Sequence, residues 1–273
     1  MAKILVSSGA LIGRPNNRNY KLLKDFVPEL YFDGLEFMLY SDWYPVLDEV
    51  MAFLNELPIE IPVIHCQKTV GELITLNDDE TALHNFKENC RLASSVGASK
   101  MVLHLWNGVP SDSNFEHNLS LYPVLLGMAN DVGVDLLVEN VLCNVKDPKS
   151  RWEELLAHYP DAHLIFDTKM ADFHGQINML YDPENAYLYK DKHIRHYHVN
   201  DYGGGYMTWE DLRVLPPGKG HIDFKRFFRY IKEIGYDDTF TVEATAFRKD
   251  GTVDIDMLNK AYEDVRRFLS EQS

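Results

Sequence analysis

Eight short runs rich in apolar and β-branched residues recur along the chain, each followed by polar residues and then by a segment with helical periodicity. The runs lie at residues 3–9, 34–39, 61–67, 100–108, 135–140, 163–170, 194–201 and 239–245. Helical periodicity is clearest over 222–236 and over 78–97, where we expect Asn77 to cap the first turn and Gly97 to end the helix. Strand and helix therefore alternate throughout.

This alternation predicts the fold class. Eight strand–helix units in 273 residues, without a Gly/Ser-rich linker, favour an α/β protein with a single (β/α)8 TIM barrel over residues 1–273. An open doubly wound sheet is the structural alternative. The sequence contains neither G-x-G-x-x-G nor G-x-x-x-x-G-K-[ST], and the GGG run at 203–205 does not open a predicted helix. It therefore gives no indication of a nucleotide cofactor.

The net charge and the cysteine pattern restrict the classes of binding partner and the cellular compartment that we expect. The net charge of −15 repels phosphate backbones, so we expect neither nucleic acid nor an anionic membrane as a partner. Cys66, Cys90 and Cys143 form no C-x-x-C pair, which is typical of a reducing, cytoplasmic setting. The first ten residues hold only a three-residue aliphatic run, so no signal peptide is expected. The expected partner is a small molecule, and a homo-oligomer is compatible with the sequence.

Residues able to bind a metal stand late in seven of the eight runs, at intervals of 28 to 45 residues. They are Glu36, His65, His104, Glu139, Asp167, His198 and Glu243. In a (β/α)8 barrel the carboxyl ends of the strands gather on the face that carries the active site, so these side chains should converge there.

Each of these residues also has a purely structural interpretation. A single strand histidine, such as His65 or His104, is more often a hydrogen-bonded interior residue than a ligand, and Glu36 could hydrogen-bond within the barrel. Several carboxylates buried together are unfavourable unless a cation or a proton compensates them. The last four runs carry consecutive candidates, which favours a metal site there: Glu139, Asp167, His198 and Glu243.

The segment RHYHVND, residues 195–201, places several polar residues on one side of a strand. Because side chains alternate along a strand, His196, His198 and Asn200 point together. A polar environment must therefore lie on that side.

The second half of the chain resembles the xylose isomerase-like barrel superfamily, in its sugar epimerase and isomerase branch, which includes tagatose 3-epimerase-like and inosose isomerase families. The resemblance rests on LVEN around Glu139, IFDT around Asp167, HYHVND around His198, TVEA around Glu243, and the run LRVLPPGKGHIDF at 212–224. It covers most of the chain in architecture, but the specific motifs lie after residue 135.

The resemblance implies that one divalent ion is bound by Glu139, Asp167, His198 and Glu243. His198 is chosen rather than His196 because the family ligand is the second histidine of its H-x-H motif. His196 would then help to orient His198. Three carboxylates and one imidazole favour Mn²⁺ or Mg²⁺, and Co²⁺ or Zn²⁺ would also fit. Glu139 and Glu243 are expected to be the acid–base pair that moves a proton next to a carbonyl.

Five residues are predicted to contact substrate: His65, His104, Trp106, Lys169 and Arg213. Trp106 shares strand parity with His104, and Arg213 stands where related isomerases also carry an arginine. Lys169 follows Asp167 by two positions, so strand alternation would place both on the same side. Met170 stands where many relatives have a histidine, which predicts a different substrate contact.

The resulting prediction is a metal-dependent isomerase or epimerase of a small sugar, ketose or keto-inositol, with phosphorylated substrates included. A different function, that of an endonuclease IV-like metal phosphodiesterase, is suggested by His65 and His104, which resemble extra zinc ligands of that branch. Met170, the GHID sequence at 220–223 and the net charge of −15 argue against it. The same residues are also compatible with a non-catalytic barrel that binds a sugar without turning it over, and with a dehydratase of the same superfamily.

Overall fold

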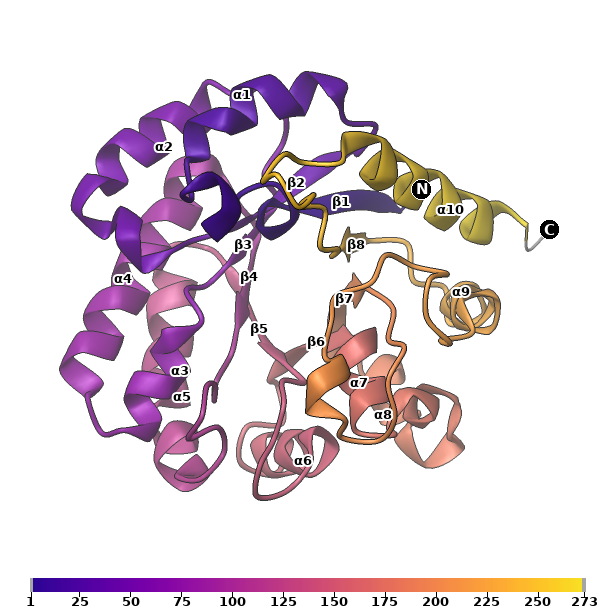
Figure 1. Ribbon diagram of the computed structural model, residues 1–273. Helices are drawn as coiled ribbons and strands as arrows, with labels where there is room; N and C mark the ends of the chain where they lie inside the picture. Colours follow the sequence, from indigo (N-terminus) through magenta and orange to yellow (C-terminus); the bar gives the residue numbers. More distant parts are fainter. Residues whose placement is uncertain (1, 272–273) are drawn as a thin grey trace. The chain divides into compact units, whose positions relative to one another are not determined.

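The computed structural model describes residues 2–271 and contains a parallel barrel of eight strands (Figure 1). The strands follow chain order from β1 to β8, and the barrel closes between β8 and β1. Their bounds are β1 (Lys3–Ser7), β2 (Gly34–Met38), β3 (Val63–His65), β4 (Lys100–Leu103), β5 (Asp135–Glu139), β6 (His163–Asp167), β7 (Ile194–Val199) and β8 (Thr239–Val242). The predicted (β/α)8 fold is confirmed, because each predicted run contains one strand.

Helices follow the strands along the chain, joined by short 3-10 turns. Within residues 2–271 the α-helices are α1 (Leu23–Phe26), α2 (Leu47–Asn55), α3 (Thr69–Thr75), α4 (Asp79–Val96), α5 (Phe115–Asp131), α6 (Pro148–His158), α7 (Thr168–Phe173), α8 (Tyr187–Lys190), α9 (Phe224–Glu233) and α10 (Ile255–Ser270). None of these helices is both long and apolar enough to cross a membrane.

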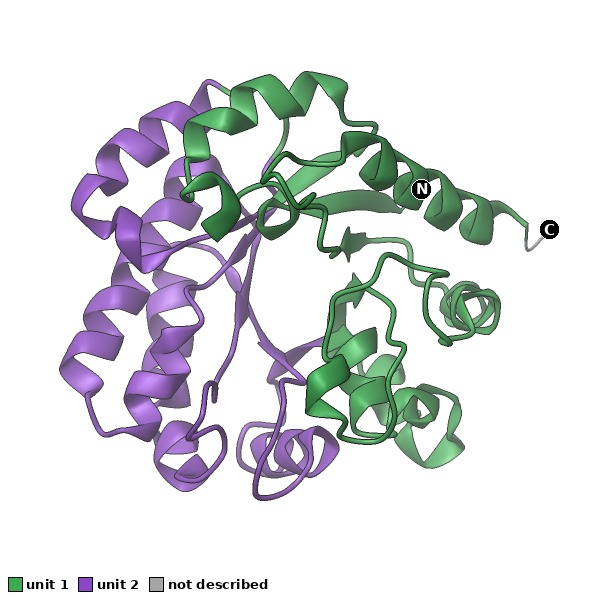
Figure 2. Cartoon of the chain, in the orientation of Figure 1, with its two compact units in different colours: residues 1–36, 57–60, 166–273 green, residues 37–56, 61–165 purple. Residues whose placement is uncertain are grey.

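Two compact units divide the chain (Figure 2). Unit 1 comprises residues 1–36, 57–60 and 166–273, and unit 2 comprises residues 37–56 and 61–165. Unit 1 therefore contains β7 and β8 with their flanking helices, whereas unit 2 contains β3, β4 and β5. The expectation of one domain over residues 1–273 stays a prediction.

The core of unit 1 is rich in aromatic side chains. Helix α9 buries Phe224, Phe227, Phe228 and Ile231, a spacing that places all four on one helical face. Phe228 stacks on Phe268 of α10 with ring centroids 5.9 Å apart. This packing joins α9 to α10, and α9 contacts β7 and β8 through the ring pairs Phe227–Tyr197 and Phe228–Phe240.

In unit 2, a glycine allows helix α3 to approach the end of β4 closely. A Cβ atom on Gly71 would lie 2.2 Å from the backbone oxygen of His104, so any larger residue would force the two segments apart. Asn118 joins the same segments, because its side-chain amide donates to the backbone oxygens of Gly71 and Leu105. The backbone around His104 is thereby fixed by direct contacts.

The N-cap residue predicted for α4 is wrong by one position. The structure places Asp78, rather than Asn77, at the N-cap, where its carboxylate accepts a hydrogen bond from the backbone N–H of Thr81. Asn77 instead has φ of 62°, a left-handed conformation that asparagine tolerates well. At the other end, Gly97 closes the helix with φ of 69°, as predicted.

The run expected at 163–170 is a shorter strand followed directly by a helix. Strand β6 ends at Asp167, whose carboxylate accepts a 2.6 Å hydrogen bond from the backbone N–H of Met170 and so caps α7. Lys169 therefore lies in the first turn of a helix, and its predicted placement by strand alternation is wrong.

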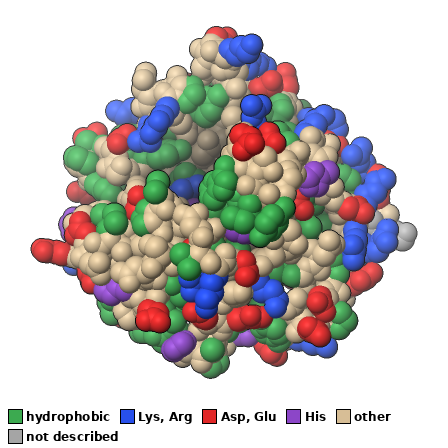
Figure 3. Space-filling view, turned by 60° about the horizontal axis from the view of Figure 1, so that its bottom comes forward, with side chains coloured by type: hydrophobic (Ala, Val, Ile, Leu, Met, Phe, Trp, Pro, Cys, Tyr) green, Lys and Arg blue, Asp and Glu red, His purple; other side chains and the backbone are tan. Residues whose placement is uncertain are grey.

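Acidic and basic side chains are interspersed on the face shown in Figure 3. On that face the described residues form no continuous basic stripe of the kind that would follow a nucleic-acid backbone.

A buried ion pair organises two loops of unit 2. The carboxylate of Asp112, after β4, accepts hydrogen bonds from the backbone N–H groups of Asn144, Val145 and Lys146, after β5, and from Arg151 Nε. Burial raises the pKa of Asp112, but these donors outweigh it and hold the pKa below its ordinary value. Asp112 thus fixes the loops that follow β4 and β5.

We expect Asp112→Asn to lower the free energy of unfolding by about 3–5 kcal/mol at pH 7, because it removes the fully buried charged partner of Arg151. Asp112 stabilises the fold fully above its unfolded pKa of about 4, and this contribution is lost as pH falls through the lower native pKa. The difference between wild type and variant should therefore shrink below about pH 4. Urea denaturation measures both effects. Glu154→Gln is the control, because Glu154 also pairs with Arg151 but is partly exposed, and should lose less than about 1 kcal/mol. Equal losses for the two variants would contradict this assignment.

Candidate active site

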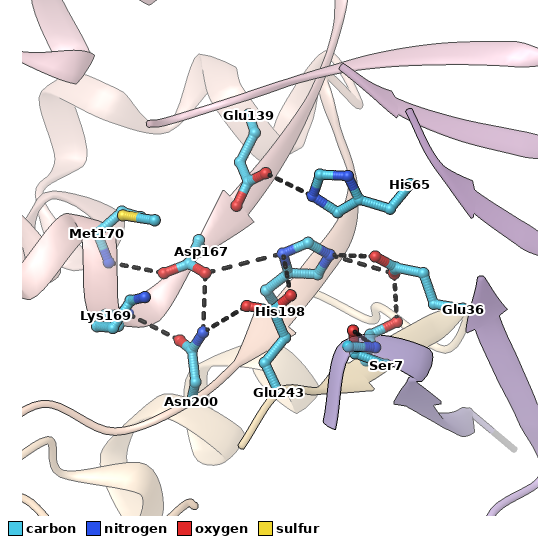
Figure 4. A network of polar contacts seen from close by, with 12 residues as sticks. Ser7, Glu36, His65, Glu139, Asp167, Lys169, Met170, His198, Asn200 and Glu243 are labelled. Carbon is cyan, nitrogen blue, oxygen red and sulfur yellow. Dashed lines mark hydrogen bonds and ion pairs between the residues drawn. The ribbon is translucent and has the colours of Figure 1, made fainter. Parts of the chain in front are cut away.

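Three predicted metal ligands come together in unit 1 (Figure 4). Asp167 ends β6, His198 lies in β7, and Glu243 directly follows β8. His198 Nδ1 lies 3.7 Å from Asp167 Oδ2 and 4.0 Å from Glu243 Oε1. These separations are too long for hydrogen bonds, but they suit atoms that surround one ion at about 2.0–2.2 Å. Asp167 and His198 are fully buried, and the Glu243 side chain is 12% exposed.

Asn200 holds the two carboxylates of this group. Its side-chain amide donates to Asp167 Oδ2 at 2.9 Å and to Glu243 Oε2 at 3.0 Å, while its own oxygen accepts from the backbone N–H of Lys169. Asn200 thus sets the spacing of Asp167 and Glu243, in agreement with the predicted polar side of RHYHVND (Figure 4).

The other nitrogen of His198 faces Glu36, in the middle of β2. His198 Nε2 lies 2.9 and 3.1 Å from the two oxygens of Glu36, which also accepts hydrogen bonds from His196 and Thr241. Burial raises the pKa of Glu36, but the charge that His198 can carry and the hydrogen bonds from both histidines outweigh it, so the pKa lies well below its ordinary value. Hydrogen bonding was one of the two roles expected for Glu36, and the structure confirms it.

A second group lies in unit 2, where the remaining predicted ligand, Glu139, meets two histidines. His104 Nε2 is 2.7 Å from Glu139 Oε2, and His65 Nε2 is 3.5 Å from the same atom. The three side chains are buried, and one ligand atom from each lies within 4.8 Å of the others. Burial lowers the pKa of His104, although the nearby Glu139 opposes this shift. His104 Nε2 donates its proton to Glu139, because a carboxylate can only accept.

The remaining predicted substrate residues occupy different environments. Trp106 is fully buried, and its indole N–H donates to the backbone oxygens of Val141 and Leu142. Lys169 is only 4% exposed, whereas Arg213 is exposed in the loop after β7. Their contacts with a substrate stay predictions.

Sequence patterns assigned no role to Asp201, which ends RHYHVND and is fully buried. Its carboxylate accepts hydrogen bonds from the backbone N–H groups of Tyr202, Gly218, Gly220 and Ile222, so it binds the PPGKG turn to the end of β7. A Cβ atom on Gly220 would lie 2.1 Å from the backbone oxygen of Tyr202, so this turn needs glycine there. The sequence signal that could have identified the role of Asp201 is an acidic residue at a strand end that is followed by a glycine-rich turn.

The chain belongs to the xylose isomerase-like TIM barrel family, whose model matches residues 25–272. The resemblance predicted from the sequence motifs is thereby confirmed. No curated protein sequence shows a significant match.

Several solved structures share the fold. A D-tagatose 3-epimerase-like protein is 21% identical with a TM-score of 0.71, covering 99% of this chain and 98% of its own. The 3-keto-D-glucoside 4-epimerase YcjR from E. coli is 16% identical with a TM-score of 0.72, covering 97% and 99%. The IolI protein, solved with a bound zinc atom, is 18% identical with a TM-score of 0.70, covering 99% of each chain. At these identities the likeness establishes the fold.

Proposed function

We propose that this protein is a divalent-metal-dependent isomerase or epimerase of a small sugar, ketose or keto-inositol, with phosphorylated substrates included. The observation that carries the proposal is the group of Asp167, His198 and the partly exposed Glu243, whose facing carboxylate oxygens are 3.7 and 4.0 Å from the histidine nitrogen. Structures of the same fold that are named as sugar epimerases support the substrate class.

The donor chemistry of this group fits a divalent cation. Asp167 is fully buried and Glu243 nearly so, and a cation is the usual compensation for carboxylates that converge in a protein interior. Carboxylate oxygens with one imidazole suit Mn²⁺ or Mg²⁺. The IolI structure of the same fold holds a zinc atom, which supports Zn²⁺ as an alternative ion. Such an ion would supply polarisation of a substrate carbonyl, which lowers the barrier to removing a neighbouring C–H proton.

We propose Glu139 as the fourth ligand. It ends β5 and pairs in register with Ile165, which precedes Asp167 by two positions along β6. Residues two positions apart on a strand face the same side, so this register supports a common side for Glu139 and Asp167. Family membership supports the same set of four, since the motifs around these residues carried the resemblance.

Glu139 and Glu243 are proposed as the acid and base. Each has one oxygen held by a hydrogen-bond donor: His104 at 2.7 Å for Glu139, and Asn200 at 3.0 Å for Glu243. These donors orient the two carboxylates. One glutamate would remove the proton next to the carbonyl, and the other would return a proton to the opposite face.

Lys169 is proposed to bind an oxygen-rich or anionic part of the substrate. It is only 4% exposed, and among residues 2–271 its ammonium group has no hydrogen-bond or ion-pair partner. A buried cation without a partner is unfavourable, so a substrate phosphate or hydroxyl oxygen would be stabilised there. His65, His104, Trp106 and Arg213 stay proposed as further substrate-binding residues.

One observation favours a second candidate, a metal phosphodiesterase. The buried group of His65, His104 and Glu139 could hold an ion of its own. Met170 stands where that branch needs a histidine, and the net charge is −15, so we rank this candidate lower. The number of ions per chain separates the two functions.

We expect the purified protein to bind about one divalent ion per chain, measured by elemental analysis and Mn²⁺ titration calorimetry. Asp167→Asn should weaken Mn²⁺ binding by at least the roughly 10- to 100-fold typical of losing a ligand's hydrogen-bond partner, because it removes the charge of a direct ligand. The fold should persist, since asparagine can still cap α7. Asp172→Asn is the control, because Asp172 lies in the same helix but pairs with His221.

A wild-type protein that binds no divalent ion, even when Mn²⁺ is supplied, would contradict the proposed site. Three tightly bound zinc ions that depend on His65 and His104 would instead support the phosphodiesterase.

Replacing either Glu139 or Glu243 with glutamine should lower turnover by about 10²- to 10⁴-fold, because each variant then lacks one positioned acid or base. The assay uses any ketose or inosose that the wild type epimerises, in deuterated water and at full ion occupancy. For a given substrate, one variant should still exchange the C–H proton from one face, and the other should not exchange it at all. Glu210→Gln, in the exposed loop after β7, is the control.

Near wild-type epimerisation by both glutamine variants would exclude the two-glutamate mechanism. Lys169 and His174, the buried residue that directly follows α7, would then be the next bases to test.

A further inference from the structure

His198 has two different environments at its two ring nitrogens. Nδ1 faces Asp167 and Glu243 at 3.7 and 4.0 Å, whereas Nε2 lies within hydrogen-bond distance of both oxygens of Glu36. A carboxylate can only accept hydrogen bonds, so Nε2 carries the proton. In a neutral imidazole, Nδ1 then presents its lone pair towards Asp167 and Glu243.

Glu36 itself is held from several sides. Its Oε2 accepts a 2.6 Å hydrogen bond from the Thr241 hydroxyl and lies 3.1 Å from His196 Nε2. His196 is fixed in turn by Thr239, whose hydroxyl lies 2.7 Å from His196 Nδ1. Glu36, His196 and Thr241 are fully buried, so this network has little freedom to rearrange (Figure 4 shows Glu36 against His198).

A direct metal site at Glu36 is the competing interpretation, because Glu36, His196 and His198 each offer one ligand atom within a 4.8 Å group. The hydrogen bonds argue against it. Both oxygens of Glu36 already have donors at 2.6 to 3.1 Å, so the carboxylate is satisfied without an ion. His198 Nε2 cannot donate a proton to Glu36 and bind an ion at the same time.

We infer that Glu36 is a positioning residue, which fixes the tautomer and the ring orientation of His198 so that Nδ1 faces the ion proposed between Asp167 and Glu243. This inference rests on the proposed function. A carboxylate hydrogen-bonded to the far nitrogen of a ligating histidine also strengthens that histidine as a ligand. Glu36 would therefore act on the ion entirely through His198.

The test is Glu36→Gln, measured by Mn²⁺ titration of the ion-free protein and by the visible absorption spectrum of the Co²⁺-loaded protein. We expect Mn²⁺ affinity to fall by about 10- to 100-fold. The Co²⁺ spectrum should change, because the histidine ligand is no longer held in one orientation. Neither readout depends on turnover.

The matched control is Thr239→Val. It removes the hydrogen bond to His196 Nδ1, which lies one residue further from His198 in the same buried network than Glu36 does. It should lower stability without changing Mn²⁺ affinity or the Co²⁺ spectrum. If Glu36→Gln fails to fold, Glu36→Asp replaces it. The shorter side chain keeps the negative charge but moves it away from His198. The Mn²⁺ affinity should then fall measurably, but by less than about 100-fold.

The outcomes separate this inference from the proposed function. If wild type binds no ion, the proposed function fails and the inference fails with it. If wild type binds one ion and the Glu36 variant shows the same affinity and the same Co²⁺ spectrum, the inference is overturned while the proposed function stands. If Glu36→Gln abolishes ion binding but Asp167→Asn does not, the ion lies at Glu36 itself, which also overturns the inference.

Discussion

The energetic cost of burying carboxylates is the constraint on which the rest of this structure depends. A carboxylate removed from water must find hydrogen-bond donors or a positive charge. Asp112 and Asp201 find theirs in backbone N–H groups, and each thereby fixes loops that follow the strands. In both cases the buried charge is satisfied within the protein, and its role is to shape the backbone around the site.

The buried carboxylates near His198 are satisfied differently. Glu36 has side-chain donors on both oxygens, so its carboxylate is satisfied by hydrogen bonds within the protein. Asp167 and Glu243 share the amide of Asn200 but keep oxygens directed at His198 Nδ1 beyond hydrogen-bond distance. What distinguishes these carboxylates is the nitrogen of His198 that they face: Glu36 lies within hydrogen-bond distance of Nε2, whereas Asp167 and Glu243 face Nδ1 at 3.7 and 4.0 Å. This difference supports placing the ion between Asp167 and Glu243 rather than at Glu36.

Much of this could be predicted from the sequence, because it follows from local pattern. The eight apolar runs predicted the barrel, and the acidic residues and histidines at their ends identified Asp167, His198 and Glu243, which the structure brings together in unit 1. Lys169 was misplaced because Asp167 caps a helix, and a capping aspartate looks the same in sequence as a strand-end ligand. The role of Glu36 depends on contacts with His196 and Thr241, which lie 160 and 205 residues away along the chain, and no local pattern encodes such contacts.

The barrel is proposed to move a proton next to a substrate carbonyl with the help of a divalent ion. The most direct test incubates Mn²⁺-loaded protein in deuterated water with a panel of ketoses and inososes, and follows each substrate by NMR. We predict that at least one substrate loses the signal of the C–H next to its carbonyl, and that chelation of the ion stops this exchange. Absence of exchange with every member of the panel, at full ion occupancy, would contradict the proposal.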